Sequence, residues 1–86
     1  MTIHDIKERI EEELPGSTAH VFDPMDDGQH LQAFVIYSKF EGLPTIKQQQ
    51  MVMESIKDIF GVVHALGLKT FTPARWETEK LKYNMK

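Results

Sequence analysis

Residues 62–76 read VVHALGLKTFTPARW, and this stretch determines the fold that we expect. Its first part is rich in apolar residues, which predicts a buried strand over residues 63–71. Thr72 and Pro73 follow directly, and a threonine cap with proline at the first helical position is a typical start of a helix. His64 stands at the beginning of the strand, where an imidazole needs a hydrogen-bond partner or a metal. His64 is therefore the first candidate for a functional residue.

A second strand is expected over residues 31–38, because Phe34 to Tyr37 are all apolar or aromatic. Between the two strands, a helix is expected to begin at Pro44 or Thr45 and to be capped by Gly61. The apolar residues of this helix recur at helical spacing and form one buried stripe, made of Val52, Ile56, Ile59 and Phe60. A strand, a helix and a strand in this order favour two parallel strands joined by a right-handed crossover.

The parallel arrangement relates two histidines that are far apart in the chain. His30 precedes the strand of residues 31–38, and His64 begins the strand of residues 63–71. Because parallel neighbours begin at the same edge of a sheet, the two side chains are expected to lie near one another. Periodicity alone does not prove this pairing, so it stands as a hypothesis of geometry.

The N-terminal part of the chain predicts a helix, a strand and a loop. An amphipathic helix is expected to run from a cap at Thr2 to a stop at Pro15–Gly16. Its apolar stripe consists of Ile3, Ile6, Ile10 and Leu14. Residues 17–23 are expected to form a short strand, and residues 24–28 form a loop rich in turn-favouring residues.

The last helix follows Thr72, contains Trp76 and is expected to end in a frayed tail from about Lys80. The full order of elements is then αββαβα. This order predicts an α+β fold in which helices pack on a three-stranded mixed sheet. A chain of 86 residues has room for one small core, so a single domain over residues 1–86 is expected.

The composition is that of an ordinary globular protein, with 41% hydrophobic and 27% charged residues. The chain has no cysteine, so no disulfide supports it, which suits a reducing compartment. The first residues lack the apolar core of a signal peptide, and no apolar run approaches the roughly 20 residues of a membrane span. We therefore expect a soluble, cytoplasmic protein that has no membrane partner.

Charge is distributed unevenly along the chain. Residues 1–45 carry three basic and nine acidic side chains, net −6, whereas residues 46–86 carry seven basic and four acidic ones, net +3. Such polarity favours an oriented surface for a partner or a weak anion-binding face. Scattered charge on solvated helix surfaces explains the same pattern equally well.

Three groups of residues carry a family resemblance. They are Phe40-Glu41-Gly42, Gln50-Met51-Val52, and His64-Ala65-Leu66 followed by Leu68, Thr70, Thr72, Pro73 and Trp76. On these residues the chain resembles the BolA family, and the resemblance extends over nearly its whole length. The segment Gly28-Gln29-His30-Leu31 is similar to the variant of the family that carries histidine in the first β-hairpin loop.

The resemblance implies a fold similar to class II KH domains and a partnership with monothiol glutaredoxins. BolA-like proteins share a [2Fe–2S] cluster with these glutaredoxins, which supply a cysteine while glutathione supplies a thiolate. The BolA-like protein supplies a strand histidine and a ligand from the hairpin loop, which on this chain are His64 and His30. The isolated chain is expected to hold no cofactor and to be a monomer or a weak homodimer.

The chemistry of imidazole agrees with a shared cluster. Histidine is a good iron ligand, and histidines that replace thiolates on one iron reduce negative charge and raise the reduction potential. A chain without cysteine cannot build an all-cysteine cluster site by itself, but it can complete a site that a partner offers.

Nucleic-acid binding is the competing class of function, since family members are described as transcriptional regulators. Lys47, Lys69 and Arg75 would supply phosphate contacts to DNA. A pI near 5.7 opposes this reading, and residues 42–45 lack the second glycine of the GXXG loop of KH domains. Gln48–Gln50 also stand where many family members carry an Arg-His-Arg-like or Arg-His-Gln-like run. A third possibility is a glutaredoxin adaptor that does not ligate iron.

The other notable side chains are expected to be structural. His4 and His20 are assigned to surface or packing roles, and Asp26-Asp27 to the hairpin turn. Trp76 and Phe71 are expected to anchor the last helix, and Met51 and Met53 to pack in the core. Because the chain has no cysteine nucleophile and no Ser–His–Asp pattern of any specificity, we do not expect an enzyme.

Overall fold

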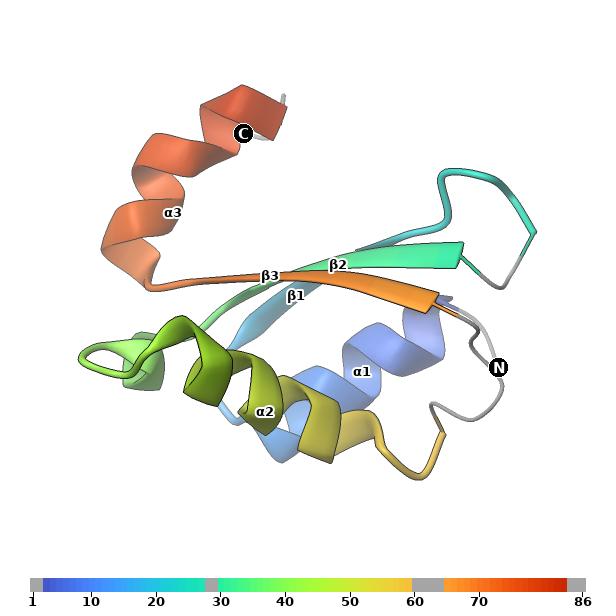
Figure 1. Ribbon diagram of the computed structural model, residues 1–86, viewed down its shortest axis with the longest axis horizontal. Helices are drawn as coiled ribbons and strands as arrows, with labels where there is room; N and C mark the ends of the chain where they lie inside the picture. Colours follow the sequence, from blue (N-terminus) through green and yellow to red (C-terminus); the bar gives the residue numbers. More distant parts are fainter. Residues whose placement is uncertain (1–2, 28–29, 60–64, 84–86) are drawn as a thin grey trace.

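The structure is a computed structural model that describes residues 3–27, 30–59 and 65–83. Three α-helices and three strands follow in the order αββαβα, as the sequence predicts (Figure 1). The elements are α1 (Ile3–Glu13), β1 (Thr18–Phe22), β2 (His30–Ile36), η1 (Ser38–Phe40), α2 (Thr45–Ile56), β3 (Ala65–Phe71), α3 (Pro73–Glu79) and η3 (Lys80–Tyr83), where η marks a 3-10 helix.

The three strands form one mixed sheet in the order β1-β2-β3. β1 pairs antiparallel with β2, and Thr18 lies opposite Ile36. β2 pairs parallel with β3 in a register that places His30 opposite Ala65 and Ile36 opposite Phe71. The expected parallel pairing of the second and third strands is therefore confirmed, and the predicted α+β class is confirmed with it.

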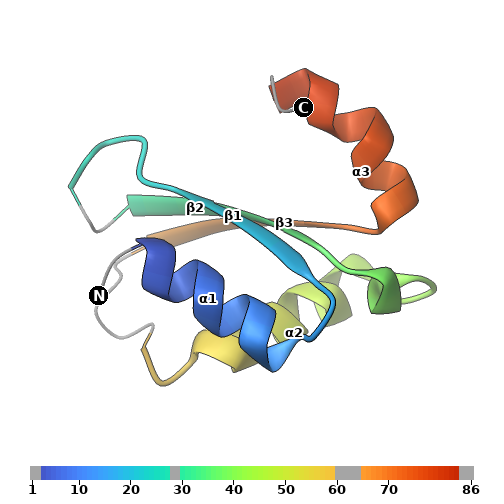
Figure 2. The ribbon, with the colours of Figure 1, turned by 180° about the vertical axis from the view of Figure 1, so that it is seen from behind.

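Helices cover both faces of this sheet. α1 and α2 lie side by side on one face, and α3 lies on the other (Figures 1 and 2). Leu31 and Val35 of β2 belong to the core under α1 and α2, whereas Phe34 and Ile36 belong to a second cluster with Phe71 and Trp76. β2 thus reads as a nearly continuous apolar run because both of its faces are buried.

The larger core joins α1, α2 and the sheet. Ile6, Ile10 and Leu14 of the predicted stripe are buried in it, whereas Ile3 remains 38% exposed. The largest fully buried side chain of the described residues is Phe40, which comes from η1. The other buried members of this core are Ala19, Leu31, Val35, Tyr37, Val52 and Ile56. Met51 and Met53 pack against it, as expected.

One acidic side chain of α1 holds the edge strand. The carboxylate of Glu11 accepts a hydrogen bond from the backbone N–H of Ala19 at 2.9 Å and pairs with Lys7. Lys7 in turn donates to the carbonyl of Ala19 at 3.0 Å. The acidic face of this helix is therefore partly a structural contact to β1.

Among the helix ends that the structure describes, the end of α2 departs from expectation and the start of α3 agrees with it. Thr2 lies outside the described residues, and so does Gly61. α2 already ends at Ile56, because the N–H of Ile59 donates to the Ile56 carbonyl at 3.0 Å and closes a tighter turn. α3 begins as predicted, with the Thr72 hydroxyl accepting from the Arg75 N–H.

Residues 84–86 lie outside the described residues, whereas residues 80–83, where a frayed tail was expected to begin, form the 3-10 helix η3. Its Tyr83 ring lies 4.6 Å from the ring of Phe34 and 6.4 Å from that of Phe71, measured between centroids. An aromatic contact of this kind buries apolar area and offsets the entropy of ordering a charged segment.

Within the described ranges, no helix has both the length and the apolar character needed to cross a membrane.

Candidate functional site

His30 is the first residue of β2, and its side chain is about half exposed, at 53%. Its Nδ1 lies 2.7 Å from Oδ2 of Asp27. The other carboxylate oxygen of Asp27 accepts the backbone N–H of His30 at 3.0 Å. One aspartate therefore contacts both the backbone and the ring of the candidate ligand.

The strand register relates His30 to the beginning of β3. His30 lies directly opposite Ala65, the first residue of β3, so the two parallel strands begin at the same edge of the sheet (Figure 1). His64 precedes Ala65 in the chain and lies outside the described residues. The proximity of the two imidazoles stays a prediction, whereas the shared edge on which it depends is confirmed.

The loop before β2 is built by aspartates. The N–H of Asp26 donates to the carbonyl of Asp23 at 3.1 Å, and the N–H of Asp27 donates to the Asp23 carboxylate at 3.2 Å. Asp26 has φ of 53°, a left-handed conformation that aspartate tolerates better than most residues. The expected turn role of Asp26-Asp27 is thus confirmed. The contact from Asp27 to His30 was not predicted, although an aspartate three residues before a histidine is a readable signal.

The candidate metal ligands among the described residues are His30 and the carboxylates near it. Within residues 3–27, 30–59 and 65–83, no group of three or more His, Cys, Asp or Glu side chains could hold a metal ion. His30 offers one imidazole whose Nδ1 is held by a carboxylate, an arrangement common around metal-ligating histidines.

The other two histidines have the surface and packing positions that were expected. His4 pairs with Glu8 on the exposed side of α1. His20 stacks on Trp76, with ring centroids 5.6 Å apart. Burial lowers the pKa of His20 below its ordinary value of 6.5, and the positive charge of Lys7 lowers it further.

Stability is expected to fall as the pH is lowered from about 6.5, because of His20. The folded state binds a proton at His20 less readily than the unfolded chain does, so protonation below pH 6.5 favours unfolding. His20→Phe keeps an aromatic ring against Trp76 and removes the titrating group. Urea midpoints at pH 7.5 and 5.5 should therefore differ less in this variant than in the wild type. An exposed control, His4→Gln, should keep the wild-type difference between the two midpoints. If His20→Phe and His4→Gln reduce this difference equally, His20 is not the group responsible for the pH dependence.

Two of the three candidate cations for nucleic acid lie close to one carboxylate. Lys69 and Arg75 line a cavity of about 320 Å³ together with Glu79. The guanidinium of Arg75 lies 3.8 Å from the Glu79 carboxylate. A hydrogen bond from Lys82 lowers the pKa of Glu79, and Arg75 and Lys69 lower it further, so the carboxylate stays charged. The negative charge of Glu79 offsets part of the attraction that Lys69 and Arg75 would exert on phosphate. The third candidate, Lys47, is exposed on the first turn of α2.

The glutamine run of α2 has a structural role that the sequence did not reveal. The amide nitrogen of Gln48 donates to the carbonyls of Leu43, at 2.8 Å, and Phe40, at 3.2 Å. Its amide oxygen accepts the hydroxyl of Thr70 at 2.6 Å. Gln49 donates to the carbonyl of Leu68 at 3.2 Å. These amides connect the start of α2 to the loop before it and to β3.

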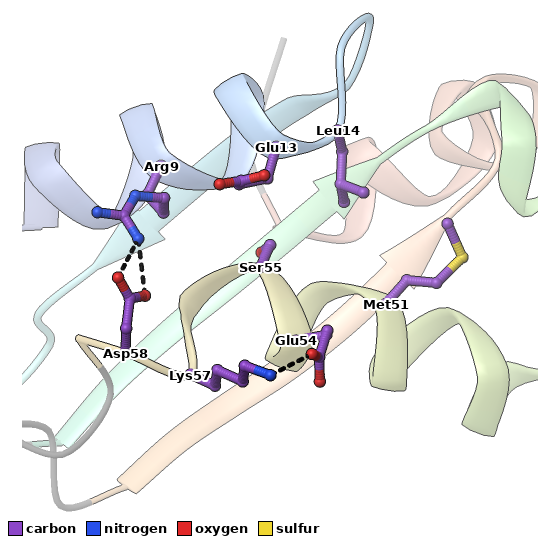
Figure 3. Close-up of a pocket in the computed structure, with 8 residues that line it drawn as sticks. All are labelled: Arg9, Glu13, Leu14, Met51, Glu54, Ser55, Lys57 and Asp58. Atoms are coloured by element: carbon purple, nitrogen blue, oxygen red, sulfur yellow. Dashed lines mark hydrogen bonds and ion pairs between the residues drawn. The ribbon is translucent and has the colours of Figure 1, made fainter.

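A cleft of about 530 Å³ lies between α1 and α2 (Figure 3). Arg9 spans it and makes two hydrogen bonds of 2.6 and 2.7 Å to the carboxylate of Asp58, while Lys57 pairs with Glu54 (Figure 3). The charges in this cleft therefore largely pair with one another. The contact between Arg9 and Asp58 fixes α1 to the turn that follows α2.

Comparison with known proteins agrees with this fold. A family model described as BolA-like protein matches residues 6–75. The acid stress protein IbaG of Escherichia coli (strain K12) is 36% identical over 58 residues, which are 63% of this chain and 67% of IbaG. BolA-like protein 1 of Homo sapiens is 33% identical over 61 residues, 70% of this chain but only 44% of that protein.

A solved structure extends the match to most of the chain. The structure of a BolA protein homologue from Coxiella burnetii matches with a TM-score of 0.77 at 34% identity, covering 90% of this chain and 97% of the other. The family match, at residues 6–75, begins within α1 and ends within α3, so it includes the paired starts of β2 and β3. With sequence, element order and sheet topology in agreement, the chain belongs to the BolA-like protein family.

Proposed function

We propose that this protein works with a monothiol glutaredoxin and supplies His64 and His30 as ligands to a shared [2Fe–2S] cluster. The complex would act in iron–sulfur cluster trafficking or in iron regulation. The chain belongs to the BolA-like family. This supports the proposal, because the resemblance to that family implies a monothiol glutaredoxin partner.

The parallel register of β2 and β3 is the observation that carries the proposal. It pairs His30 with Ala65, the residue that directly follows His64 in the chain. A half-exposed imidazole at the edge of a rigid sheet is accessible to a ligand held by another molecule. Sites on strands are also more precise than sites on loops.

The division of ligands follows from the composition. The chain has no cysteine, so the thiolates of the site would come from the glutaredoxin and from glutathione. When bound, the cluster supplies electron-transfer chemistry and is itself a cargo that can be passed on. Neutral imidazoles on one iron would lower the negative charge of the site and raise its reduction potential. The role of this chain is therefore to bind and to tune rather than to catalyse.

The proposal is tested by adding the protein to a monothiol glutaredoxin loaded with its cluster and glutathione. Visible absorption and circular dichroism are expected to change on mixing, because imidazole replaces other ligands of the iron. His64→Ala should abolish the change, and His30→Ala should reduce it. His4→Ala is the matched control, since His4 lies on the exposed side of α1 and should leave the change intact.

The same titration distinguishes a ligand from an adaptor. Complex formation is measured in parallel by analytical ultracentrifugation. If the two proteins associate and the visible spectrum does not change, the protein is an adaptor and the assignment of histidine ligands is wrong. If wild type and His64→Ala alter the spectrum equally, His64 is not a ligand.

A further inference from the structure

We propose that Asp27 is a positioning residue for the shared metal site, holding His30 so that Nε2 is its ligating atom. This inference rests on the proposed function, because it assumes that His30 binds iron. Asp27 is not one of the proposed iron ligands, which are His64 and His30, and its role is to orient one of them.

Asp27 contacts His30 at two points, one on the ring and one on the backbone. Oδ2 of Asp27 lies 2.7 Å from Nδ1 of the ring, and Oδ1 accepts the backbone N–H of His30 at 3.0 Å. Asp27 is itself fixed, because its own N–H donates to the Asp23 carboxylate at 3.2 Å. The side chains of His30 and Asp27 are 53% and 34% exposed, so the pair lies at the surface with room for a partner molecule.

The contact also selects a tautomer. A carboxylate only accepts hydrogen bonds, so Nδ1 of a neutral His30 must carry the proton that it donates to Asp27. The lone pair is then on Nε2, and that nitrogen can ligate a metal without first losing a proton. Carboxylates placed in this way raise the basicity of a ligating histidine and fix its ring orientation.

Replacement of Asp27 by asparagine reverses the tautomer while it keeps the shape of the side chain. The backbone N–H of His30 is a fixed donor, so the asparagine oxygen must face it. The amide nitrogen is then left facing Nδ1, and it can only donate. Nδ1 therefore becomes the acceptor, the ring proton moves to Nε2, and the ligating atom is blocked.

The test begins with the protein alone, without any metal. Long-range nitrogen–proton NMR spectra of the ¹⁵N-labelled full chain, at a pH where the ring is neutral, report which nitrogen of His30 carries the proton. The wild type is expected to show the Nδ1–H form, and Asp27→Asn to shift toward the Nε2–H form. The matched control is Asp26→Asn, which removes the same charge one residue away, at a left-handed position that asparagine also tolerates.

The second arm measures the shared cluster. In a titration into cluster-loaded glutaredoxin, the apparent affinity measured from the spectral change should be about 10-fold or more weaker for Asp27→Asn than for the wild type. The apparent affinity of Asp26→Asn should be close to that of the wild type. A wild-type ring protonated on Nε2 overturns the inference, as does a tautomer that is the same in wild type and Asp27→Asn. A shifted tautomer with an undiminished spectral change also overturns it, while the proposed function stands. A wild type that alters no spectrum at all overturns the proposed function itself.

Discussion

Replacing Phe40 with alanine is expected to give the largest loss of folding stability among the proposed substitutions, about 3–5 kcal/mol. Phe40 is 0% exposed and is the largest fully buried side chain of the described residues. Its ring packs edge-on against Tyr37, with centroids 5.3 Å apart. Truncation of a buried phenylalanine costs about 3–5 kcal/mol, and small domains have only about 5–15 kcal/mol in total. A single cavity at this position therefore removes a large share of the free energy of unfolding.

Urea denaturation followed by far-ultraviolet circular dichroism measures this loss. Leu81→Ala is the control, because Leu81 is 69% exposed and its truncation should change the free energy of unfolding by less than about 0.5 kcal/mol. Phe40→Leu should lie between the two, since leucine refills part of the volume. A loss below about 1 kcal/mol for Phe40→Ala would mean that the core collapses around the missing ring.

Gln48→Ala is expected to destabilise the protein by about 2 kcal/mol, which is large for a half-buried polar side chain. The reason is Thr70, a residue that is only 8% exposed. Its hydroxyl donates a hydrogen bond of 2.6 Å to the amide oxygen of Gln48. Without Gln48, this buried donor has lost its acceptor, and its desolvation is no longer compensated. The carbonyl of Leu43 also loses its amide donor.

A double-mutant cycle separates the hydrogen bond from the rest of the effect. Thr70→Val removes the hydroxyl at nearly constant volume, and Gln48→Ala in that background should cost clearly less than in the wild type. Gln50→Ala is the control on the same helix, since Gln50 is exposed and should change stability by less than about 0.5 kcal/mol. Equal costs for Gln48→Ala with and without Thr70 would show that the pair is not coupled.

The order and type of the elements were readable from the sequence because they depend on local pattern. The stripe of α1 follows the helical period, the short continuous apolar run of β2 indicates a buried strand, and Thr72 with Pro73 marks the start of α3. The ends of elements were less accessible. Whether α2 continued past Ile56 depended on a tight turn at Ile59, and the 3-10 helix over residues 80–83 depended on Tyr83 reaching Phe34.

The candidate site was predictable to the extent that topology determines it. The order strand, helix, strand was enough to place His30 and the beginning of β3 at one edge. The contact from Asp27 was not predictable in the same way, because it requires the actual turn around Asp26. Gln48 was missed for a related reason, since its partners come from a loop and from a strand and follow no periodicity.

The two buried clusters on opposite faces of the sheet have a consequence for the position of His30, the proposed ligand at the sheet edge. Sliding β2 by one residue would move Val35 into the aromatic cluster under α3 and push Phe34 into the core under α1 and α2. Both layers would have to be repacked, so misalignment is opposed from two sides at once. The backbone of the first residue of β2 is therefore located by the interior of the protein, whereas the orientation of its ring depends on Asp27 in the loop before it.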